Sequence, residues 1–241
     1  LPHCDDNTRL MISVFTSNSH VFAKMCCERV LSRYPTCEIV LGGMGVNDIG
    51  ERMIESGLCK YVIFGEGEQT IIELLNGNTD YPGINNKANQ RQVNDLDNIS
   101  FPVYDDYDMS AYDYLYKDRA EVNIVGSRGC VRRCTYCDVP SYWPKFRYRA
   151  GQNIANEMIN HYEKHGVTQF YFTDSLINGS LKAFRDMCDK LANYNSTHKA
   201  GFKWGGQFIF KPQRQLTDDY LDMIDEAGGE KCYVGVETGS D

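Results

Sequence analysis

The sequence of 241 residues lacks the features that define several common classes of protein. It has no run of eighteen apolar residues, so no membrane-spanning segment is predicted, and residues 1–6 do not read as a signal peptide. The formal net charge of −8 argues against a general nucleic-acid-binding surface, because such surfaces are basic. We therefore expect a cytoplasmic globular protein without a membrane partner. A nucleic-acid partner is not expected either, although the net charge leaves open a nucleic-acid substrate held at one local patch.

The ten cysteines are also not arranged as in a disulfide-rich secreted domain, which is short and dense in cysteine. They are scattered through a chain long enough to bury one large core or two modest ones. This distribution is typical of a protein from a reducing compartment.

Three of these cysteines stand together in the run Cys130, Cys134 and Cys137, with the spacing CxxxCxxC and with Tyr136 before the last. Electron-transfer clusters are closed by four cysteines, and structural zinc sites also need four ligands. No fourth Cys or His lies nearby in the sequence. Three thiolates on one loop can hold three corners of a 4Fe–4S cluster and leave one iron open for a small molecule. The alternatives are a structural zinc knuckle and three unrelated buried thiols.

This run resembles the cluster-binding motif of the radical S-adenosylmethionine (radical SAM) superfamily. The resemblance implies that Cys130, Cys134 and Cys137 bind the cluster and that Tyr136 lies beside the adenine of SAM. In that family the open iron binds the amino and carboxylate groups of SAM. An electron from the cluster then cleaves SAM to methionine and a 5′-deoxyadenosyl radical.

Hydrophobic periodicity predicts an α/β chain of two domains joined by a linker. Residues 1–76 are expected to form a doubly wound, Rossmann-like parallel-sheet domain, with strands at 11–15, 38–41 and 60–64. Residues 77–119 are rich in Asn and Asp and are expected to be the linker. Residues 120–241 are expected to form a partial (β/α) radical SAM barrel. Its predicted strands are 122–126, 168–173, 202–209 and 231–236, and its predicted helices are 152–165, 180–194 and 217–227.

The first region resembles the cobalamin-binding domain that precedes many radical SAM domains. The resemblance rests on Ser17 with Asn18 at a strand end, on the turn at Gly42 and Gly43, and on Gly65 in the run Gly-Glu-Gly-Glu. It implies that Ser17, Gly42, Gly43 and Gly65 lie against the nucleotide tail of cobalamin, where a side chain would fill the space. The family's cobalt-binding motif, DxHxxG, is absent. The alternative is a degenerate domain that only packs against the barrel.

Two carboxylates complete the expected SAM site. Asp174 ends the second predicted barrel strand, where the resemblance implies contact with the methionine amino group or the ribose of SAM; the alternative is capping of the next helix. Glu237 resembles the fourth-strand carboxylate that accepts hydrogen bonds from the ribose hydroxyls, and the alternative is an ordinary strand-end residue.

Basic residues surround the cysteine loop in this otherwise acidic chain: Arg128, Arg132, Arg133, Lys145, Arg147 and Arg149. They would favour an anionic cluster and the SAM carboxylate, or receive a reductant protein or an anionic substrate. The alternative is a solvated basic face paired with Asp105, Asp106 and Asp108.

The predicted function is that of a radical SAM enzyme, with methyl transfer as an outcome if cobalamin is bound. The predicted partners are a small-molecule or biosynthetic-intermediate substrate and an electron donor such as flavodoxin or ferredoxin. One alternative is a radical SAM enzyme without cobalamin, of a methylthiotransferase-like or rearranging kind, and another is a noncatalytic iron–sulfur electron-transfer module. Because only four barrel strands are readable, we expect the chain to be a fragment of a longer enzyme.

Overall fold

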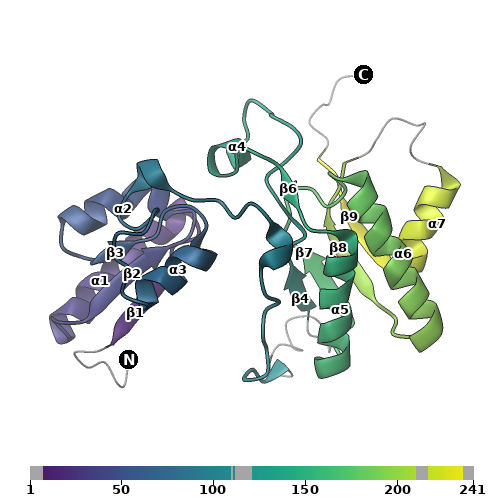
Figure 1. Ribbon diagram of the computed structural model, residues 1–241, viewed down its shortest axis with the longest axis horizontal. Helices are drawn as coiled ribbons and strands as arrows, with labels where there is room; N and C mark the ends of the chain where they lie inside the picture. The colour runs from purple at the N-terminus through teal and green to yellow at the C-terminus, as the bar shows by residue number, and fades with distance from the viewer. Residues whose placement is uncertain (1–7, 110, 112–120, 210–216, 236–241) are drawn as a thin grey trace. The chain divides into compact units, whose positions relative to one another are not determined.

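The computed structural model describes residues 8–109, 111, 121–209 and 217–235. The chain divides into two compact units, Leu1–Asn94 and Asp95–Asp241, and Figure 1 gives the elements of each. None of the helices in the described ranges has the length and apolarity that a membrane crossing requires. Both units are built from parallel strands joined by helices, so the prediction of an α/β chain with parallel sheets is confirmed.

The first unit is a three-stranded parallel sheet in the order β1-β2-β3. Its strands and helices are β1 (Arg9–Ser13), α1 (His20–Arg33), β2 (Glu38–Gly42), α2 (Val46–Glu55), β3 (Tyr61–Val62) and α3 (Gly67–Leu75). Successive side chains of a strand point to opposite faces. Ile39 and Leu41 therefore pack into one core with α1 and α2, and Val40 packs into a second core with Leu74 of α3.

The boundary between the two units lies inside the segment 77–119 that was predicted to be a linker. Residues 77–94 belong to the first unit because they return to its strands. The Phe64 N–H donates to the Gly83 carbonyl over 2.9 Å, and Asn85 Oδ1 accepts the Val62 N–H over 2.6 Å. This segment holds one short 3₁₀ turn, Lys87–Asn89, and a second turn, Leu96–Asn98, opens the other unit. The bounds of the domains and linker themselves stay a prediction.

The second unit contains a four-stranded parallel sheet in the order β4-β7-β8-β9. Three long helices connect its strands in sequence (Figure 1). The elements are β4 (Glu121–Ile124), α5 (Gly151–His165), β7 (Gln169–Phe172), α6 (Leu181–His198), β8 (Lys203–Gln207), α7 (Asp218–Glu226) and β9 (Gly229–Tyr233). These match the strands and helices predicted for the barrel, whereas closure into a barrel stays a prediction.

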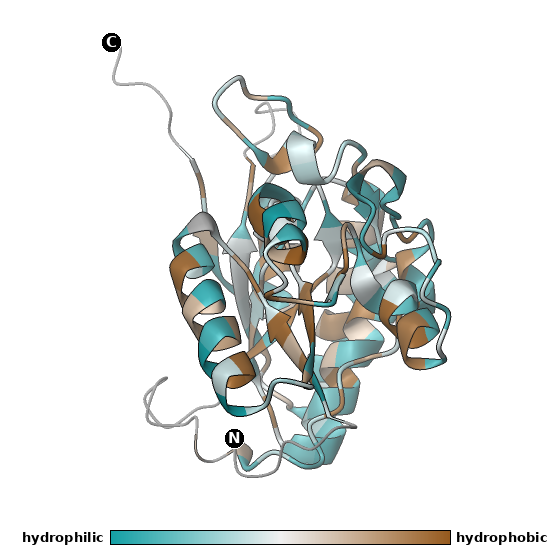
Figure 2. Cartoon of the chain, turned by 90° about the vertical axis from the view of Figure 1, so that its left-hand side faces the viewer, coloured by the Kyte–Doolittle hydropathy of each residue, from teal (hydrophilic) through white to brown (hydrophobic). Residues whose placement is uncertain are grey.

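One face of this sheet carries the core of the second unit. Ile124, Phe172 and Trp204 are at most 2% exposed and pack with apolar side chains of α5, α6 and α7. Residues that alternate with them, Asn123 and Gln207 among them, are exposed. The helices carry teal and brown residues on different sides in Figure 2, as expected for helices that bury one face only.

Gly151 lets the start of α5 lie directly on the backbone of α6. A Cβ at this position would lie 2.0 Å from the Ala183 carbonyl oxygen and 2.5 Å from the Met187 nitrogen. We expect Gly151→Ala to destabilise the second unit by about 1–3 kcal/mol, because backbone atoms cannot move aside as a side-chain tip can. Tryptophan fluorescence during urea unfolding measures this, since Trp143 and Trp204 both belong to this unit. A loss of unfolding free energy below about 0.5 kcal/mol would mean that α5 and α6 can shift apart enough to accommodate the added methyl group.

Candidate functional site

The three motif cysteines lie on a loop closed by a short hairpin that the sequence did not predict. Strands β5 (Ser127–Arg128) and β6 (Arg147–Tyr148) pair antiparallel directly after β4. The loop between them also contains the short helix α4 (Val139–Tyr142). The hairpin therefore fixes where the loop leaves the carboxyl end of the first strand, which is the end where parallel α/β sheets place their ligands.

Gly129 anchors this loop just before its first cysteine. Its φ is +84°, and a Cβ would lie 2.9 Å from the Lys145 carbonyl oxygen. Only glycine combines this backbone conformation with so close an approach. Across the loop, Arg133 Nη2 donates to the Pro144 carbonyl over 3.2 Å. The two arms of the loop are thus held together beside Cys130.

The thiols of Cys130, Cys134 and Cys137 are free, and each is at least partly exposed. Other cysteines of the chain are in a different environment. Burial raises the pKa of Cys27 to about 11 and the pKa of Cys59 to about 12, so these thiols stay protonated. The loop cysteines are accessible to a metal ion, whereas Cys27 and Cys59 are buried.

The loop offers thiol groups, which are the ligands that iron–sulfur clusters use, and it places them at the carboxyl end of a parallel strand. Three accessible thiols follow one another on one anchored loop, and none is in a disulfide. Among the residues that the structure describes, no three Cys, His, Asp or Glu side chains are gathered closely enough to hold a metal ion. Tyr136, the aromatic of the motif, is 69% exposed and is accessible to a ligand.

Asp174 lies just after β7 and is turned into the protein. The residue is 4% exposed. Its Oδ2 accepts the Gly126 N–H over 2.9 Å and its Oδ1 accepts the Ser127 hydroxyl over 2.5 Å. Burial raises the pKa of Asp174 to about 6, and these hydrogen bonds oppose that rise. The cap of the next helix, α6, is Ser180, whose hydroxyl accepts the Ala183 N–H, so Asp174 does not cap it.

The space beside Asp174 is too small for SAM. A cavity of about 20 Å³ is lined by Asp174, Ser127 and Phe146 among others, which is room for about one water molecule. The carboxylate therefore contacts the strand-to-hairpin segment in this arrangement, and the expected contact with SAM stays a prediction.

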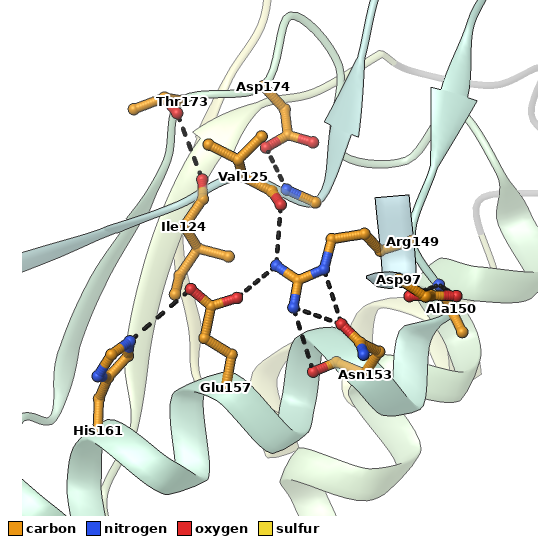
Figure 3. A network of polar contacts seen from close by, with 11 residues as sticks. Asp97, Ile124, Val125, Arg149, Ala150, Asn153, Glu157, His161, Thr173 and Asp174 are labelled. Carbon is orange, nitrogen blue, oxygen red and sulfur yellow. Dashed lines mark hydrogen bonds and ion pairs between the residues drawn. The ribbon is translucent and has the colours of Figure 1, made fainter. Parts of the chain in front are cut away.

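Arg149 forms a buried network that the sequence did not reveal (Figure 3). Its guanidinium pairs with Glu157 of α5, donates from Nη1 to the Val125 carbonyl over 3.0 Å and donates from Nε to Asn153 Oδ1 over 2.8 Å. Arg149 is 6% exposed and Glu157 is 2% exposed. For Arg149 the alternative of a solvated basic face paired with Asp105, Asp106 and Asp108 was wrong, because the side chain is buried and its partner is Glu157, eight residues later.

The same network extends along α5 to His161. The His161 Nε2 atom lies 3.7 Å from Glu157 Oε1, and the ring packs on Tyr104 with centroids 5.2 Å apart. Asp105, which the sequence paired with the basic residues, lies instead 3.4 Å from His165 Nε2. Beside the network is a cavity of about 190 Å³. Its lining includes Leu96, Pro102, Asn123, Val125, Arg128 and Glu157.

The predicted cobalamin residues lie at the carboxyl ends of the strands of the first unit. Gly42 ends β2, and a Cβ there would meet nothing within 4 Å. At Gly43 a Cβ would lie 2.6 Å from the Val14 oxygen, and at Gly65 it would lie 2.6 Å from the Arg91 oxygen. Both of these glycines have positive φ. Their lack of a side chain is therefore explained by the chain's own packing, without a ligand.

Ser17 opens the 3₁₀ turn Ser17–Ser19 that follows β1. His20, the first residue after this turn, is hydrogen-bonded through Nε2 to the Gly45 carbonyl oxygen over 2.9 Å. This contact ties the turn to the turn after β2. No pattern in the sequence singled out His20. These residues do not by themselves define a cobalamin cradle. Glu237 lies outside the described residues, and its role stays a prediction.

Together the fold and the loop define a class: an α/β protein with two parallel sheets, in which the first strand of the second sheet leads directly into a three-cysteine loop. No protein-family model matches the sequence. Individual relatives do match. Cytidylyl-2-hydroxyethylphosphonate methyltransferase of Streptomyces wedmorensis is 25% identical over 156 residues, which are 60% of this chain and 27% of that protein.

Two further relatives cover more of the chain. Anaerobic magnesium-protoporphyrin IX monomethyl ester cyclase of Synechocystis is 24% identical over 219 residues, 85% of this chain and 43% of that protein. The radical SAM methyltransferase TsrM of Kitasatospora setae, solved with tryptophan and a SAM analogue, has the same fold with a TM-score of 0.69 at 15% identity. That match covers 95% of this chain and 48% of TsrM, and TsrM has also been solved with cobalamin and a [4Fe–4S] cluster.

The chain is thus distantly similar in sequence to this methyltransferase and this cyclase, and it shares the fold of TsrM, a radical SAM methyltransferase that has been solved with cobalamin bound. The chain spans less than half the length of these relatives and matches mainly their N-terminal half.

Proposed function

We propose that this chain is the cluster-bearing part of a radical SAM enzyme, in which Cys130, Cys134 and Cys137 hold a 4Fe–4S cluster. The observation that carries the proposal is the anchored loop, with three free and accessible thiols at the carboxyl end of the first strand of a parallel sheet. When bound, such a cluster supplies the electron that cleaves SAM.

The chain's own residues would bind and orient the two reactants. Gly129 and the hairpin of β5 and β6 hold the loop against the sheet. Tyr136 is exposed on that loop and offers an aromatic face to the adenine of SAM. Arg132 and Lys145 are exposed, and their positive charge would attract the SAM carboxylate and an acidic electron-donor protein, such as a flavodoxin or a ferredoxin.

The substrate is proposed only as a small molecule or a biosynthetic intermediate. The relatives' names describe two methyltransferases and a cyclase, so methyl transfer and ring formation are the reaction types that fit this proposal. The proposal that cobalamin binds is supported by the similarity to TsrM, which has been solved with cobalamin. The described residues of the first unit add no support to it. A cytoplasmic location is likewise part of the proposal.

The proposal is tested by anaerobic reconstitution of the chain with iron and sulfide. We expect about four irons per chain and, after reduction with dithionite, 5′-deoxyadenosine and methionine from SAM. Cys134→Ala should lose the cluster and the cleavage, because two thiolates cannot hold the three corners. Cys26→Ala is the matched control, since Cys26 is an exposed free thiol in the other unit.

Equal iron content in Cys134→Ala and the unsubstituted chain would contradict the assignment of the ligands. A cluster that forms without SAM binding would favour the alternative of a noncatalytic electron-transfer module.

A further inference from the structure

One peptide group, between Val125 and Gly126, is held from both sides by buried charged side chains (Figure 3). Its carbonyl accepts from Arg149 Nη1 over 3.0 Å, and its N–H donates to Asp174 Oδ2 over 2.9 Å. The next carbonyl, that of Gly126, accepts the Arg149 N–H over 2.8 Å. This peptide is the point where β4 ends and the hairpin begins, and Gly126 lies four residues before the first motif cysteine, Cys130.

Asp174 uses both carboxylate oxygens on this segment. Oδ2 takes the Gly126 N–H and Oδ1 takes the Ser127 hydroxyl, whose oxygen also lies 3.3 Å from the Leu176 carbonyl. Ser127 is 6% exposed and Asp174 is 4% exposed. An O–H to carboxylate distance of 2.5 Å is typical of a charge-assisted hydrogen bond, which is about twice as strong as a neutral one.

Gly126 allows this close arrangement. A Cβ on Gly126 would lie 3.0 Å from Ile154 Cδ1 and 3.3 Å from Asp174 Oδ1. The strand exit is thus packed against α5 on one side and tied to the end of β7 on the other. A carboxylate suits this place because it only accepts hydrogen bonds, and both groups that face it are donors.

We propose that Asp174 is a positioning residue of the cluster site. By fixing Gly126 and Ser127 it sets the direction in which the hairpin carries Cys130, Cys134 and Cys137. The geometry of this inference comes from the two hydrogen bonds of Asp174. Its consequence for the cluster and for SAM rests on the proposed function. Asp174 would then act on the cluster site through the loop, while its direct contact with SAM stays a prediction.

The test compares Asp174→Asn with Thr173→Val in the reconstituted chain. Asparagine keeps the shape of the side chain, but its NH₂ group is a hydrogen-bond donor. It would therefore face another donor, either the Gly126 N–H or the Ser127 hydroxyl. Thr173→Val changes the neighbouring exposed residue and removes the hydrogen bond from its hydroxyl to the Ile124 carbonyl over 3.4 Å; it is the matched control, because it loses a contact to β4 that involves neither Gly126 nor Ser127. We expect Asp174→Asn to bind SAM about 10- to 100-fold more weakly, as for other residues that orient metal ligands, with Thr173→Val unchanged.

Spectroscopy separates positioning from a general loss of structure. Asp174→Asn should keep the circular dichroism of the unsubstituted chain while the electron paramagnetic resonance signal of its reduced cluster responds differently to SAM. Ser127→Ala removes one of the two hydrogen-bond donors to Asp174. It should change the SAM affinity and the electron paramagnetic resonance response in the same direction as Asp174→Asn does, but by a smaller amount. Equal SAM affinity and equal spectra for Asp174→Asn and Thr173→Val would overturn the proposal.

Hydrogen exchange keeps the two proposals distinguishable. If no cluster forms in the unsubstituted chain, the proposed function fails. The positioning inference is then decided by the amides of residues 126–130. Faster exchange there in Asp174→Asn than in Thr173→Val would support it, and equal exchange would overturn it.

Discussion

Glu157→Leu is expected to destabilise the second unit by about 3–5 kcal/mol. The substitution leaves the Arg149 guanidinium buried without its carboxylate partner, at a residue exposure of 6%. Arg149 retains hydrogen bonds to Val125 and Asn153, but neutral acceptors do not compensate a buried charge. Urea unfolding followed by tryptophan fluorescence measures the loss.

Two further variants isolate the charge from the packing. Glu163→Leu removes an exposed carboxylate from the same helix, together with its hydrogen bond from the Tyr194 hydroxyl, and should change the unfolding free energy by about 1 kcal/mol at most. Arg149→Met combined with Glu157→Leu should recover much of the loss, because no unpaired charge remains. A single-variant cost below about 1 kcal/mol would mean that water in the neighbouring cavity solvates the arginine.

Asp174→Asn should change how the stability of the second unit depends on pH. Burial raises the pKa of Asp174 from 3.8 to about 6. The folded chain therefore binds this proton more tightly than the unfolded chain, so the resulting stability is complete below about pH 4 and lost as the pH rises through about 6. At about 1.4 kcal/mol for each pKa unit, the contribution that disappears is about 3 kcal/mol.

The measurement is the unfolding free energy of the cluster-free chain at a series of pH values from about 4 to 7. The advantage of the unsubstituted chain over Asp174→Asn should shrink by up to about 3 kcal/mol across this range. Asp189→Asn removes an exposed carboxylate from α6 and serves as the matched control. A difference between the unsubstituted chain and Asp174→Asn that stays constant with pH would show that the carboxyl titrates outside this window.

The order of strands and helices followed from the sequence because hydrophobic periodicity is a local property. The predicted strands at 122–126 and 168–173 correspond to β4 and β7, and the predicted helix at 152–165 corresponds to α5. The predicted helix at 180–194 continues to His198, where Lys199 ends it in a left-handed conformation with φ of 52°. Element ends depend on single residues and caps, which periodicity does not report.

The hairpin of β5 and β6 could not be found in this way. Each of its strands has two residues, and the partners are nineteen or more positions apart in the chain. A strand of two residues is too short to show an alternation of polar and apolar residues in the sequence. It becomes a strand only because its partner pairs with it in the folded chain. The same holds for the segment 77–94, which has only weak periodicity and yet closes the first unit through backbone hydrogen bonds.

The chemistry that the loop can offer was already evident in the amino-acid sequence. Three cysteines at fixed spacing are a local pattern, and their thiols are the donors that a cluster needs whatever the rest of the chain does. How the polar residues around them are used depends on the folded structure. It buried Arg149 against Glu157 and turned Asp174 toward Gly126 and Ser127. These partners lie 8 and about 47 positions apart, and burial with a specific partner is a property of packing that no spacing in the sequence encodes.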